Sequence, residues 1–202
     1  THHNWASTNL KSSGVDLSGV DFAAGGYTVT GTNFVALNLT GARFAGLSVT
    51  GSLYLANATN ADFTGANVTA TLFGTTITGA NFTNATGLTG ANVKSAGKNW
   101  TGTRFAGTGL DLTGTNFSTG GYPLVGADLS GVNLTNAVLT GRNLTGTKLN
   151  GATMTGATIG TANLTNAVLT GVTGSPAGGS TATYGTTTCP DAVVTNGTTI
   201  TS

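Results

Sequence analysis

Charged residues are scarce in this sequence, and glutamate and glutamine are missing altogether. Of its 202 residues only 6% are charged, with six Asp against seven Lys and Arg and a formal net charge of +1. A typical soluble domain carries about 25% charged residues. Because no Lys or Arg residues are clustered, we expect no basic surface for nucleic acid. Six carboxylates are also too few to form an acidic surface that imitates DNA.

Other absences exclude further classes of protein. A single cysteine, Cys189, leaves no intrachain disulfide to form. No apolar run approaches the roughly 20 residues that span a bilayer, so we expect no transmembrane segment. The two histidines are adjacent at the start of the chain and the aspartates are scattered. No catalytic constellation is visible, and we expect a protein that is not an enzyme and has no cofactor.

Threonine, glycine and asparagine are abundant instead, and they fall into a repeat. An apolar residue returns every five positions along the second half of the chain. A period of five fits neither the 3.6 of a helix nor the 2.0 of a long strand, but it fits a very short strand followed by a corner. The apolar residues of this run are Leu129, Leu134, Leu139, Leu144, Leu149, Met154, Ile159, Leu164 and Leu169.

Around these apolar residues the repeat has a preferred chemistry. In its clearest units a small residue stands two positions before the apolar residue, Asp or Asn one position before it, and Ser or Thr after it, as in Ala127–Gly131, Ala162–Asn166 and Ala61–Gly65. In this the chain resembles the pentapeptide-repeat family from roughly Val15 to Val172. The resemblance implies an all-β fold, a right-handed four-sided parallel β-helix with about twenty residues per coil, which would form a rod.

The two halves of the chain are related by a shift of 95 residues. Between Asn4 and Phe34, 12 of 31 positions are identical at that offset. Both halves contain jumps of seven between apolar residues, which predict two-residue insertions at matching corners. Taking Tyr27 and Tyr122 as inward residues places these insertions beside the pairs Gly25–Gly26 and Gly120–Gly121, which could supply positive φ. Tyr54 is expected to be a later inward residue of the first half.

Three regions are therefore expected. Residues 1–97 form a first repeat module, residues 98–172 form a second module that continues the same β-helix, and residues 173–202 form a linker and a tail. Gly174–Gly179 is typical of a linker. In the tail, Val193–Thr195 and Thr198–Ile200 flank Asn196–Gly197, which predicts a β-hairpin. This tail either caps its own chain or pairs with another molecule, and its candidate assembly residues are Cys189, Val193, Val194 and Ile200.

Two further sets of residues are candidates for binding. Stacking by twenty aligns Asn143 and Thr145 with Asn163 and Thr165, and such an exposed Thr/Asn face could bind ice or a surface glycan. At the start of the chain, Thr1, His2 and His3 could surround Cu(II) or Ni(II) in a square plane if Thr1 carries an unblocked amine. A tag remnant or a solvated chain end explains the same three residues.

The sequence thus favours a non-enzymatic structural protein that is secreted or on the cell surface, with Thr1 in place of Met suggesting a removed leader or a trimmed end. Near-zero net charge favours self-association, end to end or through the tail, into a filament or surface layer. A ligand-binding rod is the alternative. A DNA-mimicking topoisomerase modulator, an activity of some members of the family, is less favoured because those members are strongly acidic.

Overall fold

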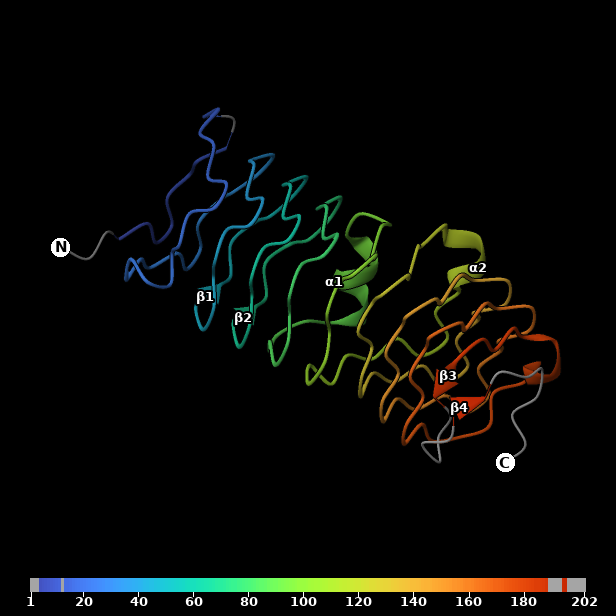
Figure 1. Ribbon diagram of the computed structural model, residues 1–202. Coiled ribbons are helices and arrows are strands. Elements are labelled where there is room, and N and C mark those ends of the chain that lie inside the picture. The colour runs from blue at the N-terminus through green and yellow to red at the C-terminus, as the bar shows by residue number, and fades with distance from the viewer. Residues whose placement is uncertain (1–3, 12, 189–193, 196–202) are drawn as a thin grey trace. The chain divides into compact units, whose positions relative to one another are not determined.

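The computed structural model describes residues 4–11, 13–188 and 194–195 (Figure 1). The chain divides into two compact units, residues 1–97 and residues 98–202, and the first has the bounds of the first expected module. Regular elements are few and short within both units. They are β1 (Ser48–Val49), β2 (Asn67–Val68), α1 (Gly90–Ser95), α2 (Phe117–Gly120), the 3-10 helix η1 (Gly179–Thr181), β3 (Thr187–Thr188) and β4 (Val194–Thr195).

Parallel bridges between successive coils hold each unit together. In unit 2 most bridges have the offset that the family resemblance implied, as in Asn133 with Thr153. In unit 1, from Asn33 onward, the offset is one residue shorter, as in Asn57 with Thr76, and β1 pairs with β2 at this shorter offset. These bridges belong to a ladder of backbone hydrogen bonds between coils, for example from the amide of Leu134 to the carbonyl of Thr153 at 2.7 Å. Each unit is therefore an all-β solenoid.

The expected coil length is correct for most of unit 2 and wrong for unit 1. From Asn33 onward in unit 1, one side of each coil is a residue shorter, because the inward residues Val49 and Leu53 are four positions apart, as are Val68 and Leu72. Leu53 is fully buried, whereas Tyr54, expected to point inward, is 39% exposed. The five-residue spacing of inward residues fails here because the shorter side of the coil has four residues and no place for a fifth.

The two insertions near Gly-Gly pairs lie five residues earlier than expected. Val29 and Leu124 are the buried inward residues, and Tyr27 and Tyr122 belong to the insertions that precede them. In unit 2 the insertion forms α2. The amides of Ser118 and Thr119 donate to the Asn116 side chain, and Gly121, with φ of 67°, follows the helix. Gly26 has φ of 64° at the matching place in unit 1. The expected positive φ is thus right for the second glycine of each pair.

Stacked columns of inward side chains form the two cores. In unit 1 the rings of Phe22, Phe44, Phe63 and Phe82 stack at centroid distances of 4.8, 5.0 and 4.9 Å, with interplanar angles of 13° or less. These distances equal the ordinary spacing of neighbouring strands, so each ring lies directly above the ring of the coil before it. In unit 2 the equivalent column begins with Phe117 and continues with Leu139 and Ile159, and all three are equally buried.

Buried threonines complete the cores while keeping their hydroxyls bonded. The hydroxyl of Thr75 donates to the carbonyl of Leu53 at 2.6 Å, and that of Thr147 donates to the carbonyl of Leu124 at 2.9 Å. Both carbonyls belong to the preceding coil. Threonine can therefore replace the small apolar residue of the repeat at little cost, because its hydroxyl finds a partner within the solenoid.

Helix α1 covers the last coil of unit 1. Thr89 caps the helix by accepting the amide of Asn92 at 3.1 Å, and the Asn92 side chain donates to the carbonyl of Ala70 at 2.9 Å. The side chain of Val93, within α1, is fully buried. Just before this point, Gly87 stands where the repeat would place an inward apolar side chain. A helix with one buried face then supplies the apolar cover that a further coil would have given.

The solenoid of unit 2 continues through the segment expected to be a linker. Thr173, Ala177, Thr183 and Thr188 pair in parallel with Thr153, Thr158, Asn163 and Val168. The expectation of a linker at Gly174–Gly179 is therefore wrong. Backbone bridges continue the coil here, although the five-residue pattern of side chains has ended. Strand β4 then pairs antiparallel with β3, so this part of the tail folds back on its own chain. The expected turn at Asn196–Gly197, and Cys189, Val193 and Ile200, lie outside the described residues.

Candidate functional site

The expected Thr/Asn face is present in unit 2, and its side chains are bonded to one another. Asn143 and Asn163 form a parallel bridge, as the stacking by twenty predicted. The Thr145 hydroxyl donates to Asn143 Oδ1 at 2.6 Å, and the Thr145 backbone amide donates to the same oxygen at 3.1 Å. The Thr165 hydroxyl and backbone amide donate to Asn163 Oδ1 in the same way, at 2.7 and 3.0 Å. The hydroxyl protons that a ligand or an ice surface would need are therefore already donated within the repeat.

This local bond recurs throughout both units, which gives it a structural explanation. An Asp or Asn side chain that accepts the amide and the hydroxyl two residues later closes the corner after each short strand. The same pair of bonds is made at Asn38, Asn57, Asp62, Asn81, Asp111, Asn116, Asp128 and Asn133. Asn143, Thr145, Asn163 and Thr165 thus share the geometry of the other repeats, and binding by this face stays a prediction.

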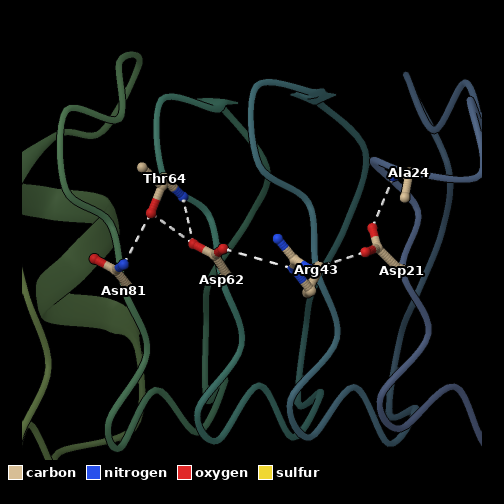
Figure 2. A network of polar contacts seen from close by, with 6 residues as sticks. All are labelled: Asp21, Ala24, Arg43, Asp62, Thr64 and Asn81. Atoms are coloured by element: carbon tan, nitrogen blue, oxygen red, sulfur yellow. Dashed lines mark hydrogen bonds and ion pairs between the residues drawn. The ribbon is translucent and has the colours of Figure 1, made fainter.

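A row of charges lies on one side of unit 1 (Figure 2). Arg43 Nη1 lies 3.0 Å from Asp21 Oδ2, and Arg43 Nε lies 4.0 Å from Asp62 Oδ2. The Arg43 side chain is 57% exposed, so this arrangement contributes little to stability. Its consequence concerns the surface potential: two of the six aspartates face a cation on the neighbouring coil and do not form an acidic surface.

The ionisation of Asp16 is displaced by a hydrogen bond within its own repeat. The Ser18 amide donates to its carboxylate at 2.9 Å and holds the pKa of Asp16 below its ordinary value. A lowered pKa in the folded state favours the folded chain above the ordinary Asp pKa and loses that contribution as the pH falls through the folded value. Asp16 thus serves the corner of its repeat.

Unit 1 also carries an exposed apolar surface that the repeat pattern did not predict. We call Val35, Tyr54, Leu55 and Phe73 the apolar corner. Tyr54, Leu55 and Phe73 are 39%, 52% and 54% exposed, and the rings of Tyr54 and Phe73 stack at 5.5 Å and 9°. The adjacent apolar pairs Leu53–Tyr54 and Leu72–Phe73 occupy equivalent places on successive coils. A search for the shorter period would have shown that one residue of each pair must face outward.

Leu55 occupies an unusual backbone conformation within the apolar corner. Its φ is +56°, at a position where the next coil has Gly74, with φ of +67°. Most other corners of this conformation in unit 1 are occupied by glycine or asparagine, as at Gly65 and Asn60, and the exceptions, Ser7 and Ala36, are small residues. A left-handed conformation costs a bulky side chain of this kind about 1–2 kcal/mol. Strain of this kind, at an exposed apolar side chain, is a feature of binding surfaces.

Neither a catalytic nor a metal-binding cluster accompanies these surfaces among the residues that the structure describes. Within those ranges, no group of three His, Cys, Asp or Glu residues lies close enough to hold a metal ion. The candidate Cu(II) or Ni(II) ligands Thr1, His2 and His3 lie outside them. No helix of residues 4–11, 13–188 and 194–195 is long and apolar enough to cross a membrane.

Together the ladder, the inward columns and the corner bonds define a solenoid protein built from five-residue units. Residues 124–160 match the family model described as pentapeptide repeats, in eight copies. These residues are thus a run of pentapeptide repeats. The resemblance that the sequence analysis found is thereby confirmed, although the matched residues cover a small part of the chain.

Several solved structures are similar to this chain. A pentapeptide-repeat protein, Rfr23, from the cyanobacterium Cyanothece is 29% identical over 47% of this chain and 50% of its own, with a TM-score of 0.23. HetL, a pentapeptide-repeat protein involved in heterocyst differentiation regulation in the cyanobacterium Nostoc, is 24% identical over 96% and 92%, with a TM-score of 0.26. QnrB1, a plasmid-mediated fluoroquinolone resistance protein, is 17% identical over 85% and 82%, with a TM-score of 0.35.

These similarities do not extend to function. The chain spans half the length of the Rfr23 chain that it matches. A comparison with curated protein sequences finds no match. With identities this low and TM-scores below 0.5, no partner or activity is transferred from these structures to this chain.

Proposed function

We propose that this protein is a non-enzymatic structural protein of the cell exterior that assembles with copies of itself through the apolar corner. The observation that carries the proposal is the exposed stack of Tyr54 and Phe73 beside the strained Leu55. Exposed apolar side chains gathered in this way mark interaction surfaces in soluble proteins. Three of the four large apolar side chains that are exposed among the described residues belong to this corner.

A second copy of the chain is the occupant that the charge distribution favours. The net charge of +1 over 202 residues removes the electrostatic repulsion that keeps many proteins monomeric. The Arg43 row pairs its own charges within unit 1, so it offers little to a partner of either sign. An uncharged, apolar contact between copies requires no charge complementarity, and an apolar corner repeated on each copy provides it.

The proposal places the contact between copies on the apolar corner and not on the tail. The sequence analysis expected association end to end or through the tail. Strand β4 pairs with β3 of its own chain and occupies the edge that a donated strand would use. The abundance of Thr, Asn and Gly and the scarcity of charged residues support the exterior location, and fractionation of the source cells would test it. The right-handed sense of the coil, implied by the family resemblance, belongs to the same proposal and is testable by crystallography.

Light scattering and sedimentation of the full chain over a wide range of concentrations test the proposal. We expect reversible self-association that is lost in the double variant Leu55→Asn, Phe73→Thr. The matched control is Val15→Thr, which removes the fourth exposed large apolar side chain, 41% exposed and outside the apolar corner. A chain that stays monomeric at all concentrations, or a double variant that associates as strongly as the wild type, would reject the proposal.

A further inference from the structure

One arginine of unit 2 stands where the repeat places a small residue. Arg142 lies two positions before the inward Leu144, in the place that Ala137 and Thr147 take in the neighbouring repeats, and both of those are fully buried. Its backbone follows the regular pattern: its amide donates to the carbonyl of Leu139 at 3.0 Å, and its carbonyl accepts the amide of Asn163 at 2.9 Å. The side chain therefore leaves the backbone in the direction of the core.

The guanidinium of Arg142 is only partly satisfied. Its Nε is buried and has no hydrogen-bond partner. Among the described residues, none forms an ion pair with this side chain, in contrast to Arg43 and Lys148, which face aspartates. Burying a donor of a charged group without a partner is costly, and such a group in a folded protein requires an explanation. A ligand that accepts hydrogen bonds is one.

Arg142 lines a hollow at the insertion of unit 2. The hollow has a volume of about 300 Å³, and its other lining residues are Gly121, Tyr122, Pro123, Val125, Gly141 and Asn143. This volume is at the lower end of the range for small-molecule sites. The Tyr122 ring is held by Trp100 at 5.2 Å and 64° and by Phe117 at 5.7 Å and 76°. The hollow therefore has a cation, an amide and largely apolar walls, and one wall is fixed in place by aromatic contacts.

The duplication shows that the fold does not require this arginine. At the offset of 95 residues the position of Arg142 is occupied in unit 1 by Leu47, whose amide donates to the carbonyl of Phe44 at 3.0 Å and whose carbonyl accepts the Asn67 amide at 2.9 Å. The aromatic cluster is also present there, with Tyr27 against Trp5 at 5.7 Å and against Phe22 at 5.6 Å. The same backbone thus accepts leucine in one unit and arginine in the other.

We propose that the Arg142 hollow binds a small organic carboxylate. A guanidinium fork matches the two oxygens of a carboxylate, and charge-assisted bonds of this kind are among the strongest in proteins. One cation neutralises one carboxylate, whereas the fuller charge of a phosphate calls for more donors than the hollow provides. Tyr122, Pro123 and Val125 contact the apolar body of the ligand, and the Asn143 amide lies at the same wall.

Titration of the full chain with sodium benzoate, followed by NMR of the arginine Nε–H signals and by calorimetry, tests this assignment. We expect a saturable shift of the Arg142 signal. Arg142→Leu, which copies unit 1 and so preserves the fold, weakens benzoate binding by about tenfold or more. Arg142→Lys keeps the charge without the fork and gives an intermediate loss. The matched control is Arg104→Leu, which removes an exposed arginine of the same unit and leaves binding unchanged.

Two further probes separate the contributions to binding. Benzamide has the same ring without the charge, and inorganic phosphate has charge without an apolar body; we expect both to bind more weakly than benzoate. Equal affinity for benzamide, stronger binding of phosphate, or benzoate binding that survives Arg142→Leu would each overturn the proposal. Circular dichroism of each variant verifies the fold. Self-association in the absence of benzoate reports on the apolar corner alone, so the two proposals can fail independently.

Discussion

At the scale of single residues, the inward positions of the repeat are not equivalent in what they contribute. A phenylalanine in the middle of the unit 1 stack contacts one ring in the coil before and one in the coil after, so it loses packing on both sides when it is shortened. Phe63 is the clearest case, fully buried between Phe44 at 5.0 Å and Phe82 at 4.9 Å. The outward rings, by contrast, contact one partner and solvent.

Phe63→Ala should lower the free energy of unfolding by about 3–5 kcal/mol, because it opens a cavity inside an otherwise continuous stack. Denaturant unfolding followed by fluorescence and circular dichroism measures the loss. Phe73→Ala is the matched control: the same substitution at a ring that is 54% exposed should cost less than about 1.5 kcal/mol. A loss at Phe63 no larger than the loss at Phe73 would contradict the stacked core.

Leu55→Asn should increase the free energy of unfolding by about 0.5–1 kcal/mol, since asparagine tolerates the left-handed conformation better than leucine. Denaturant unfolding at a concentration where the chain is monomeric measures the gain. The control is Leu53→Asn, which places an amide in the buried core two residues away and should destabilise strongly. If Leu55→Asn destabilised the monomer, the conclusion that Leu55 is strained by its φ of +56° would be wrong.

At the scale of elements, helices stand where the five-residue pattern stops or is interrupted. Helix α1 follows the loss of the repeat after Gly87, and α2 fills the insertion before Leu124. Both depend on a polar side chain at their start, Thr89 for α1 and Asn116 for α2. Thr and Asn are ordinary capping residues of helices, and here they accept backbone amides of the first helical turn.

Asn92→Ala should weaken the cover of unit 1 by about 1 kcal/mol, because the Ala70 carbonyl loses the bond from Asn92 Nδ2. Native-state hydrogen exchange should show faster exchange at the Gly74 and Gly97 amides, which bond to Ser95 and Thr75 near the helix. Asn84→Ala changes an asparagine of the preceding coil at a corner and serves as the comparison, with little effect on those two amides. Unchanged exchange in Asn92→Ala would mean that α1 does not hold the end of the unit.

At the scale of the whole molecule, the distribution of charge matters more than its amount. The sequence has nearly equal numbers of acids and bases, and several of them are paired on neighbouring coils, as Asp128 with Lys148 at 4.0 Å and Asp21 with Arg43 at 3.0 Å. A surface of this kind has little long-range field. We therefore expect neither nucleic-acid binding by a basic stripe nor imitation of nucleic acid by an acidic face.

Self-association should therefore depend little on salt. We expect the association constant of the full chain to change by less than about twofold between low and moderate ionic strength, since the contact is apolar and the net charge is +1. Sedimentation at matched protein concentrations and several salt concentrations measures it. A steep fall with added salt would point to a contact made by charged groups and away from Tyr54, Leu55 and Phe73.

The five-residue period was sufficient to predict the solenoid, because each inward apolar residue, corner bond and ladder rung is specified within a few neighbouring positions. Leu134, Leu144 and Leu164 lie buried where the period put them. The expectation failed where two adjacent residues could both occupy the inward position, as with Leu53 and Tyr54. It failed again at Gly174–Gly179, where the coil continues with few side chains to mark it. The candidate face of Asn143 and Asn163 was aligned correctly, but its internal hydrogen bonds were not foreseen.

The sequence by itself determined the repeat, the duplication and the neutral surface, since all three are properties of residue types and their spacing. The tertiary structure decided which residue of each ambiguous pair is buried, because a coil that is one residue shorter turns different side chains outward. It also decided that Arg142 lines a hollow, at the place where unit 1 has Leu47. Contacts between coils depend on residues far apart in the chain, and no local pattern records them.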